Sequence, residues 1–155
     1  MDIQTLCDLF ASAIAQDPAL SLFGETEYDT APTVYVNVDP RQPPQASNCP
    51  FVAIWPTSKT GGTDEQVATF EVVCCLHDET SQQTHDSRIV QFAGVYNIET
   101  MRRAVSAAIS GADLGTASVA SIETEYDTIE LFPFFIAAMT VTVTEPWTIG
   151  ENPFE

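Results

Sequence analysis

The chain has 155 residues, and 22 Asp and Glu against 5 Lys and Arg give it a formal net charge of −17 at pH 7. With 45 % hydrophobic and 17 % charged residues, it can bury a core without disulfides or metal, which argues against intrinsic disorder. Five cations cannot form the basic stripe that a nucleic-acid backbone requires, so a sequence-reading nucleic-acid binder is nearly excluded.

The N-terminus and the cysteines bear on the cellular compartment. The first residues contain no basic region of the kind that opens a secretory signal, and no apolar run approaches the ~18–20 residues of a membrane span. Adjacent Cys74 and Cys75 would point to opposite faces of a strand and are not expected to bridge each other. Together with Cys7 and Cys49, they show no framework spacing and are expected to be buried free thiols in a reducing cytosol.

The N-terminal third predicts one helix and one strand. Asp2 can cap a helix that stops before Pro18, and its apolar stripe is Ile3, Leu6, Phe10, Ala13 and Ile14. Residues Thr33–Val38 alternate apolar and polar side chains, as a half-buried strand does. The proline-rich segment 39–50 that follows predicts an extended surface connector.

Two apolar runs then predict an antiparallel hairpin. Phe51–Trp55 lies between two prolines, and Val67–Leu76 is rich in β-branched and aromatic residues. The sequence between them supplies turn residues, so the hairpin tip is expected at Gly61 and Gly62.

The middle of the chain is more ambiguous. Residues 77–87 read as a polar loop, and residues 88–96 fit either a short strand or the first half of a helix, because Gly94 interrupts both patterns. Asn97 is a plausible N-cap of a helix that Gly111 would end. The apolar stripe of this helix is Ile98, Met101, Val105, Ala108 and Ile109.

Two strands are predicted near the C-terminus, at Thr116–Glu123 and Phe134–Thr144. The second alternates most clearly, with one face formed by Phe135, Ala137, Met139, Val141 and Val143. Because strands are grouped rather than alternating with helices, we predict an α+β fold in which two main helices cover one face of a mainly antiparallel sheet of about 4–6 strands. The expected organisation is a single domain at 1–146 and a tail at 147–155.

One hexapeptide, ETEYDT, occurs twice, at Glu25–Thr30 and at Glu123–Thr128. It could be an acidic, tyrosine-containing element that is presented to a partner. We favour coincidence in an acid-rich chain, because the similarity does not extend into the flanking residues as it does in repeat architectures.

Both histidines of the chain are followed by aspartate, and they lie in a segment rich in possible metal ligands. We favour a solvated acidic loop here, since no rigid scaffold is implied. Phosphate loops, nucleophile elbows and dinucleotide fingerprints are absent from the sequence, so no catalytic residue, metal or cofactor is expected. The possible ligands are Cys74, Cys75, His77, Asp78, Glu79, His85 and Asp86.

Surfaces without a role inside the chain are candidates for assembly. They comprise the hairpin tip, the threonine face of the last strand and two aromatic residues of the tail, since aromatic side chains are favoured interface anchors. Trp147 could equally fold back onto the core. The candidate interface residues are Lys59, Thr60, Gly61, Gly62, Thr63, Thr140, Thr142, Trp147 and Phe154.

The order of elements resembles that of the tail-terminator (minor tail protein U-like) proteins of long-tailed bacteriophages. The resemblance rests on the N-terminal helix and the glycine-tipped hairpin, and on the segments PTVYVN, CPFVAIWP, NIETMRRAVSAAI and EYDTIELFPFFIAAMTVTVTEPW. It covers most of the chain as architecture and general pattern, and no catalytic motif marks this family.

The resemblance implies a non-enzymatic virion protein that assembles in the host cytoplasm as a homo-hexameric ring at the head-proximal end of the tail tube. Its partners would be the tail tube protein and a head-completion (stopper) protein, and the segment Thr57–Asp64 would order on the tube. DNA would pass an acidic lumen without specific binding, and no membrane would be involved. Two alternatives stay open: another head–tail connector or baseplate protein, and a small metal-dependent hydrolase using His77, Asp78, His85 and Asp86.

Overall fold

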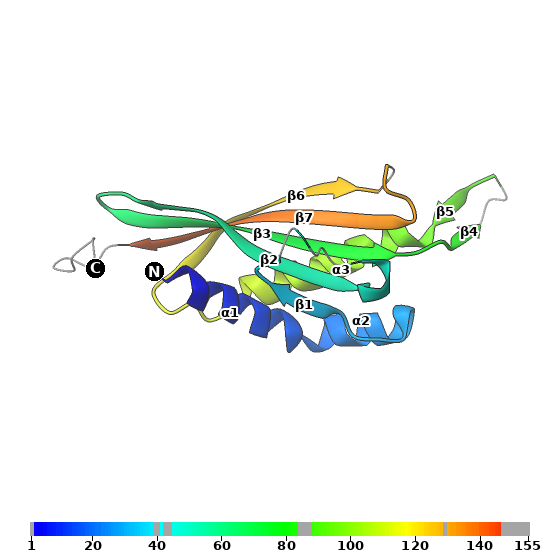
Figure 1. Ribbon diagram of the computed structural model, residues 1–155, viewed down its shortest axis with the longest axis horizontal. Coiled ribbons are helices and arrows are strands. Elements are labelled where there is room, and N and C mark those ends of the chain that lie inside the picture. The colour runs from blue at the N-terminus through cyan, green and yellow to red at the C-terminus, as the bar shows by residue number, and fades with distance from the viewer. Residues whose placement is uncertain (1, 39–40, 42–44, 84–87, 129, 147–155) are drawn as a thin grey trace.

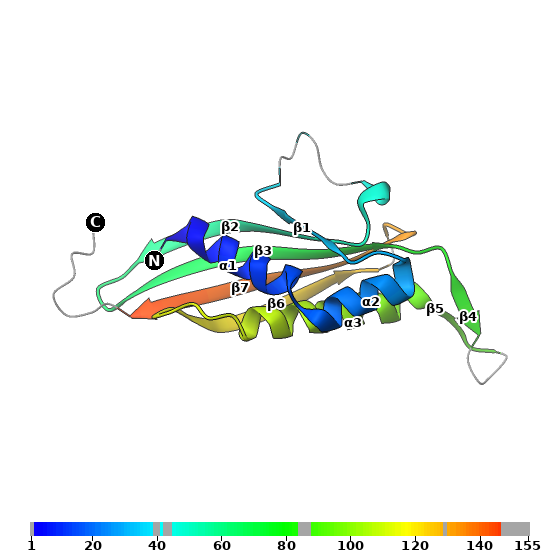
Figure 2. The same ribbon diagram turned by 90° about the horizontal axis from the view of Figure 1, so that it is seen from below.

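One five-stranded sheet carries the helices on one of its faces (Figures 1 and 2). The computed structural model describes residues 2–38, 41, 45–83, 88–128 and 130–146. Within these residues the chain forms three α-helices, one 3-10 turn and seven strands, five of which build the main sheet. The predicted α+β class with a mainly antiparallel sheet is confirmed. Trp147 and Phe154, and with them the predicted tail, lie outside the described residues.

The main sheet has the strand order β1-β2-β3-β7-β6. Its strands are β1 (Thr33–Val36), β2 (Phe51–Gly61), β3 (Glu65–His77), β7 (Phe134–Pro146) and β6 (Ser118–Asp127). Only β1 pairs in parallel, with β2, and the other three pairings are antiparallel.

The predicted hairpin is confirmed as β2 and β3, although β2 is longer than expected. Pro56 does not end the strand, because the register shifts between Pro56 and Ser58 and this irregularity accommodates the proline. β1 is shorter than expected, since the chain leaves the strand at Asn37, where φ is 54°.

The first helix, α1 (Ile3–Ala15), forms as predicted, and the Asp2 carboxylate accepts the backbone N–H of Thr5 at 3.0 Å. A second helix, α2 (Pro18–Tyr28), was not predicted. The carboxylate of Asp17 caps it by accepting the Leu20 N–H at 2.7 Å, and Pro18 occupies its first turn. Proline ends one helix here and begins the next, because its fixed φ suits the first helical position.

The predicted N-cap at Asn97 is wrong. The third helix, α3 (Ala93–Ser110), begins five residues earlier than predicted, and Asn97 lies inside it with 7 % of its surface exposed. The Asn97 side chain donates a hydrogen bond to the hydroxyl of Tyr28 at 3.0 Å, which explains why a polar residue is buried there. Gly111 caps the C-terminus of α3, as expected.

A second, two-stranded sheet projects from one end of the molecule (Figures 1 and 2). It consists of β4 (Ser81–Gln83) and β5 (Val90–Phe92), which pair antiparallel, and we call it the arm. The polar-loop prediction is therefore wrong at residues 81–83. In the ambiguous segment 88–96, both patterns are present in turn, because the strand β5 leads directly into α3.

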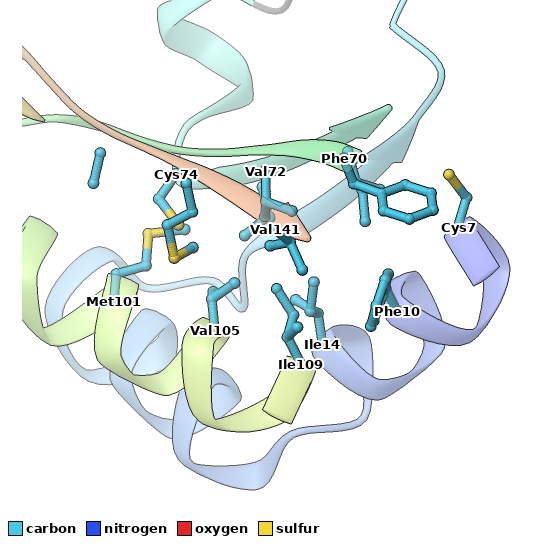
Figure 3. Close-up of a cluster of buried hydrophobic side chains, with 14 of the residues drawn as sticks. Cys7, Phe10, Ile14, Phe70, Val72, Cys74, Met101, Val105, Ile109 and Val141 are labelled. Carbon is cyan, nitrogen blue, oxygen red and sulfur yellow. The ribbon is translucent and has the colours of Figure 1, made fainter. Parts of the chain in front are cut away.

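The core fills the space between the helices and the inner face of the sheet (Figure 3). Phe10 of α1 meets Phe70 of β3 edge to face, with ring centroids 5.5 Å apart. The predicted alternation in β7 is confirmed, and Cys74 and Cys75 do belong to opposite faces of β3. The face of the sheet turned away from the helices, the helix-free face, carries a smaller apolar cluster around Phe51, Ala53 and Cys75.

Candidate assembly surfaces

The hairpin tip extends the sheet past the helices (Figure 2). Residues Thr57–Glu65 are exposed, and the strands β2 and β3 stay paired as far as Gly61 and Gln66. The structure therefore gathers the predicted residues Lys59 to Thr63 at one exposed end of the molecule. Because the two strands are paired up to the tip, they hold its side chains in position to contact a partner.

The helix-free face has a polar half next to the hairpin tip. Strand register aligns four hydroxyl side chains in one row across the sheet, namely Ser58, Thr69, Thr142 and Ser121. In the neighbouring row, Thr140 donates a hydrogen bond to Glu71 at 3.3 Å. Thr140 and Thr142 are half-buried by their neighbours. They thus lie on a continuous polar surface, as the alternation in β7 predicts.

A third surface was missed in the sequence. Large apolar side chains with 44–66 % of their surface exposed lie on or beside the arm, in the first turn of α3 and in the β6–β7 turn. The rings of Phe92 and Phe132 lie 5.6 Å apart and join these segments. This arm patch comprises Ile89, Val90, Phe92, Val95, Tyr96, Leu131 and Phe132. The apolar residues of segment 88–96 were the available signal. A clustered apolar surface of this kind marks an interaction site more often than scattered residues do.

The described residues among the possible metal ligands make other contacts. Asp78 accepts hydrogen bonds from the Tyr28 hydroxyl at 2.9 Å and from the Thr80 N–H at 2.8 Å. The His77 ring stacks edge to face on Phe134, 5.1 Å between centroids. His85 and Asp86 lie outside the described residues, and among the described ones no three His, Cys, Asp or Glu side chains are grouped to hold a metal.

The two copies of ETEYDT adopt different structures. The first ends α2, and the second lies in β6. The tyrosine of each copy nevertheless forms a hydrogen bond with α3. The Tyr28 hydroxyl accepts one from Asn97, and the Tyr126 hydroxyl donates one to Glu99. Tyr28 is half-buried, and burial above all raises the pKa of its hydroxyl, which therefore remains protonated at neutral pH and donates a hydrogen bond to Asp78. The first copy is thus a structural contact in the described fold.

Glu99 is the centre of an ionic cluster on α3. Its carboxylate accepts two hydrogen bonds from Arg102, both at 2.8 Å, one from Arg103 at 2.7 Å and one from Tyr126. These donors, Arg102 above all, lower the pKa of Glu99 to about 2. Since the folded-state pKa is below that of the unfolded chain, the cluster stabilises the fold above about pH 4.5 and loses this contribution as the pH falls towards 2.

Replacing Glu99 with glutamine is expected to lower the free energy of unfolding at pH 7 by about 1 kcal/mol, because charge-assisted bonds at a partly exposed site are worth no more. Urea unfolding at pH 7 and near pH 2 measures the effect, and the two proteins should converge at the lower pH. Glu125→Gln makes the same charge change at an exposed position of β6 and is expected to alter stability by less than about 0.5 kcal/mol. A difference between Glu99→Gln and the parent chain that does not shrink on acidification would contradict the assignment.

Comparisons with known proteins add a structural relationship. No protein-family model matches the sequence, and no curated protein matches it. The fold, however, is similar to that of a chain in a solved structure described as the virion of a native gene transfer agent (GTA) particle. The TM-score is 0.55 at 13 % identity, and the match covers 94 % of this chain and 98 % of that one. At this identity the comparison establishes a shared fold.

No helix among the described residues has both the length and the apolar composition needed to cross a bilayer.

Proposed function

We propose that the protein is a structural component of a phage-like virion, and specifically a tail terminator that closes the head-proximal end of the tail tube as a hexameric ring. The observation that supports this most is the fold, which is shared along nearly the whole of both chains with a chain from a gene transfer agent virion. The role is mechanical: the ring would stop tube polymerisation and offer a docking surface to a head-completion protein. The protein would assemble in the host cytoplasm and remain in the virion.

The arm patch is the surface that we assign to contact between subunits. A closed ring needs heterologous contacts, in which one patch of a subunit meets a different patch of the next. Exposed aromatic residues such as Phe92, Tyr96 and Phe132 contribute strongly to such contacts when they become buried. The arm projects beyond the main sheet, so it can reach a neighbouring subunit without moving the core (Figure 1).

The hairpin tip and the hydroxyl row are assigned to the tail tube protein. The tip lies at the end of the molecule opposite the arm (Figures 1 and 2), and the hydroxyl row crosses the sheet next to it, so one subunit could contact its neighbours and the tube with separate surfaces. Acidic side chains at Glu123, Glu125 and Asp127 alternate along β6 and point to the helix-free face. If this strand borders the lumen, its charge would repel DNA phosphates and let DNA pass unbound.

Electron microscopy of the parent particle with a labelled copy of the protein tests the position and the number of subunits. We expect a six-fold ring between the tube and the head, and over-long tubes without heads when the gene is deleted. A ring at the baseplate, or one between a stopper and the capsid, would replace the terminator assignment with another virion role. Normal joined tails after deletion would contradict a role in tail completion.

The double substitution Phe92→Ser and Leu131→Ser tests the arm patch. We expect it to weaken ring formation by roughly 10–100-fold, because buried hydrophobic anchors dominate interface energy. Serine at position 92 also supplies the missing N-cap of α3, so the monomer should remain folded. Leu22→Ser is the control, since Leu22 is 66 % exposed on α2 and belongs neither to the arm nor to the β6–β7 turn. Equal assembly of both variants, measured by sedimentation at increasing concentration, would rule out the patch as the subunit contact.

A further inference from the structure

Two of the four cysteines lie together at the start of β2. Cys49 follows the 3-10 turn η1 (Ala46–Asn48), and Cys75 lies in β3, where Phe51 is its partner across the hairpin. Their Sγ atoms are 3.8 Å apart. A disulfide has a sulfur–sulfur length of about 2.05 Å, so the thiols need to approach by less than about 2 Å for a bond to form.

The surroundings give the two thiols different roles. Cys75 is only 4 % exposed and packs with Phe51 and Ala53, whereas Cys49 is partly exposed to solvent. When Cys49 is ionised, the Cys75 thiol can donate a hydrogen bond to it, and this bond lowers the pKa of Cys49. Because the thiolate is the reactive form, Cys49 is the sulfur that reacts first.

We propose that Cys49 and Cys75 form an oxidisable pair, which is reduced in the host cytoplasm and becomes a disulfide when a peroxide-class oxidant reaches the released particle. The timing rests on the proposed virion location, whereas the chemistry of the pair does not. Reducing conditions inside cells keep thiols free, and oxidising conditions outside allow disulfides to persist.

The reaction balances in two steps. The Cys49 thiolate attacks one oxygen of hydrogen peroxide, the O–O bond breaks, and hydroxide leaves while Cys49 becomes a sulfenic acid. The Cys75 sulfur then attacks the Cys49 sulfur and displaces the oxygen, while the Cys75 proton and the released groups form water. Two thiols and one peroxide thus yield one disulfide and two waters. The hydrogen bond to the Cys49 thiolate and, to a smaller extent, its charge raise the pKa of Cys75, and both are gone by the second step.

The disulfide would constrain the hairpin that carries the exposed tip. It would close the chain between positions 49 and 75, which contains β2, the exposed tip and β3 as far as Cys75. Cross-linking a chain stabilises a fold mainly by restricting the unfolded state. It would also hold the end of the proline-rich connector on the apolar half of the helix-free face.

Treatment of the purified full chain with hydrogen peroxide or diamide tests the pair. We expect a mass loss of about 2 Da after diamide, a reduction by two in the thiols titrated after denaturation, and a rise in melting temperature of about 5–10 °C that dithiothreitol reverses. Cys49→Ser should abolish all three changes. Cys74→Ala, next to Cys75 but on the opposite face of β3, should retain them.

Two results would overturn the proposal. The first is a parent chain that keeps all its thiols after diamide while remaining folded by circular dichroism. The second is a mass loss that persists in Cys49→Ser, since another pair would then carry the bond. Because these measurements use the isolated chain, they stand apart from the position of the protein in a particle. An absence of rings with an intact thiol pair would count against the virion role alone.

Discussion

Replacing Phe70 with alanine is expected to lower the free energy of unfolding by about 3–5 kcal/mol, because it removes a fully buried aromatic ring and leaves a cavity. Phe70 is 0 % exposed and lies against Phe10, so the loss affects the contact between α1 and the centre of the sheet (Figure 3). For a chain of this length, the melting temperature should fall by about 6–20 °C. Calorimetry or urea unfolding of the isolated chain measures the change.

Phe92→Ala provides the control for Phe70→Ala. It removes the same ring from a position that is 44 % exposed, where no closed cavity can result. The expected loss of stability is at most about 1 kcal/mol. If the two substitutions cost the same, Phe70 would not hold the central place in the core that its burial assigns to it.

Replacing Gly94 with alanine is expected to destabilise the fold by about 2–3 kcal/mol through overpacking. A Cβ atom at this position would lie 2.3 Å from Cε2 and 2.4 Å from Cδ2 of Phe135. That ring is 1 % exposed and also contacts Phe132, so it has little room to move away. The first turn of α3 would have to shift off the sheet, and the arm patch would be displaced with it.

Gly61→Ala is the matched control for Gly94→Ala. No atom lies within 4 Å of a Cβ built at Gly61, and the stability should change by less than about 0.5 kcal/mol. Urea unfolding measures both variants. Assembly assays should show whether Gly94→Ala also weakens ring formation, as displacement of the patch predicts. A neutral Gly94→Ala would mean that α3 can lie farther from β7 than it does here.

Periodicity predicted those elements that bury one continuous face. The alternating apolar residues of β7 and the apolar stripe of α1 face the same core (Figure 3), so both patterns can be recognised in the sequence. The helix α2 buries little beyond Leu20 and Gly24, and its apolar pattern is correspondingly weak. The Asp17–Pro18 pair is a helix start signal for α2, but a proline at this position equally predicts the end of α1.

The start of α3 and the arm depended on contacts that lie far apart in the sequence. In the sequence, Gly94 resembles a helix breaker. In the fold, the Phe135 ring occupies the space that a side chain at position 94 would fill, so glycine is needed there. Asn97 resembles an N-cap until Tyr28, 69 positions away, is seen to accept its hydrogen bond. For the candidate surfaces, alternation located the threonine face of β7 and turn residues located the hairpin tip, whereas the hydroxyl row across the sheet depends on strand register. The arm patch could not be predicted, because it forms only when the arm meets the β6–β7 turn.

The two tyrosines of the repeated hexapeptide have a mechanical consequence. They bond to Asn97 and Glu99, which are two positions apart and therefore lie about 200° apart around the axis of α3. One hydroxyl comes from α2 and the other from β6, so the helix is braced on nearly opposite sides against rotation about its own axis. Val95 and Tyr96 directly precede Asn97 and Glu99 in the same helix. A subunit would therefore present them in a fixed orientation before it meets its neighbour, which reduces the ordering cost of each contact in a ring.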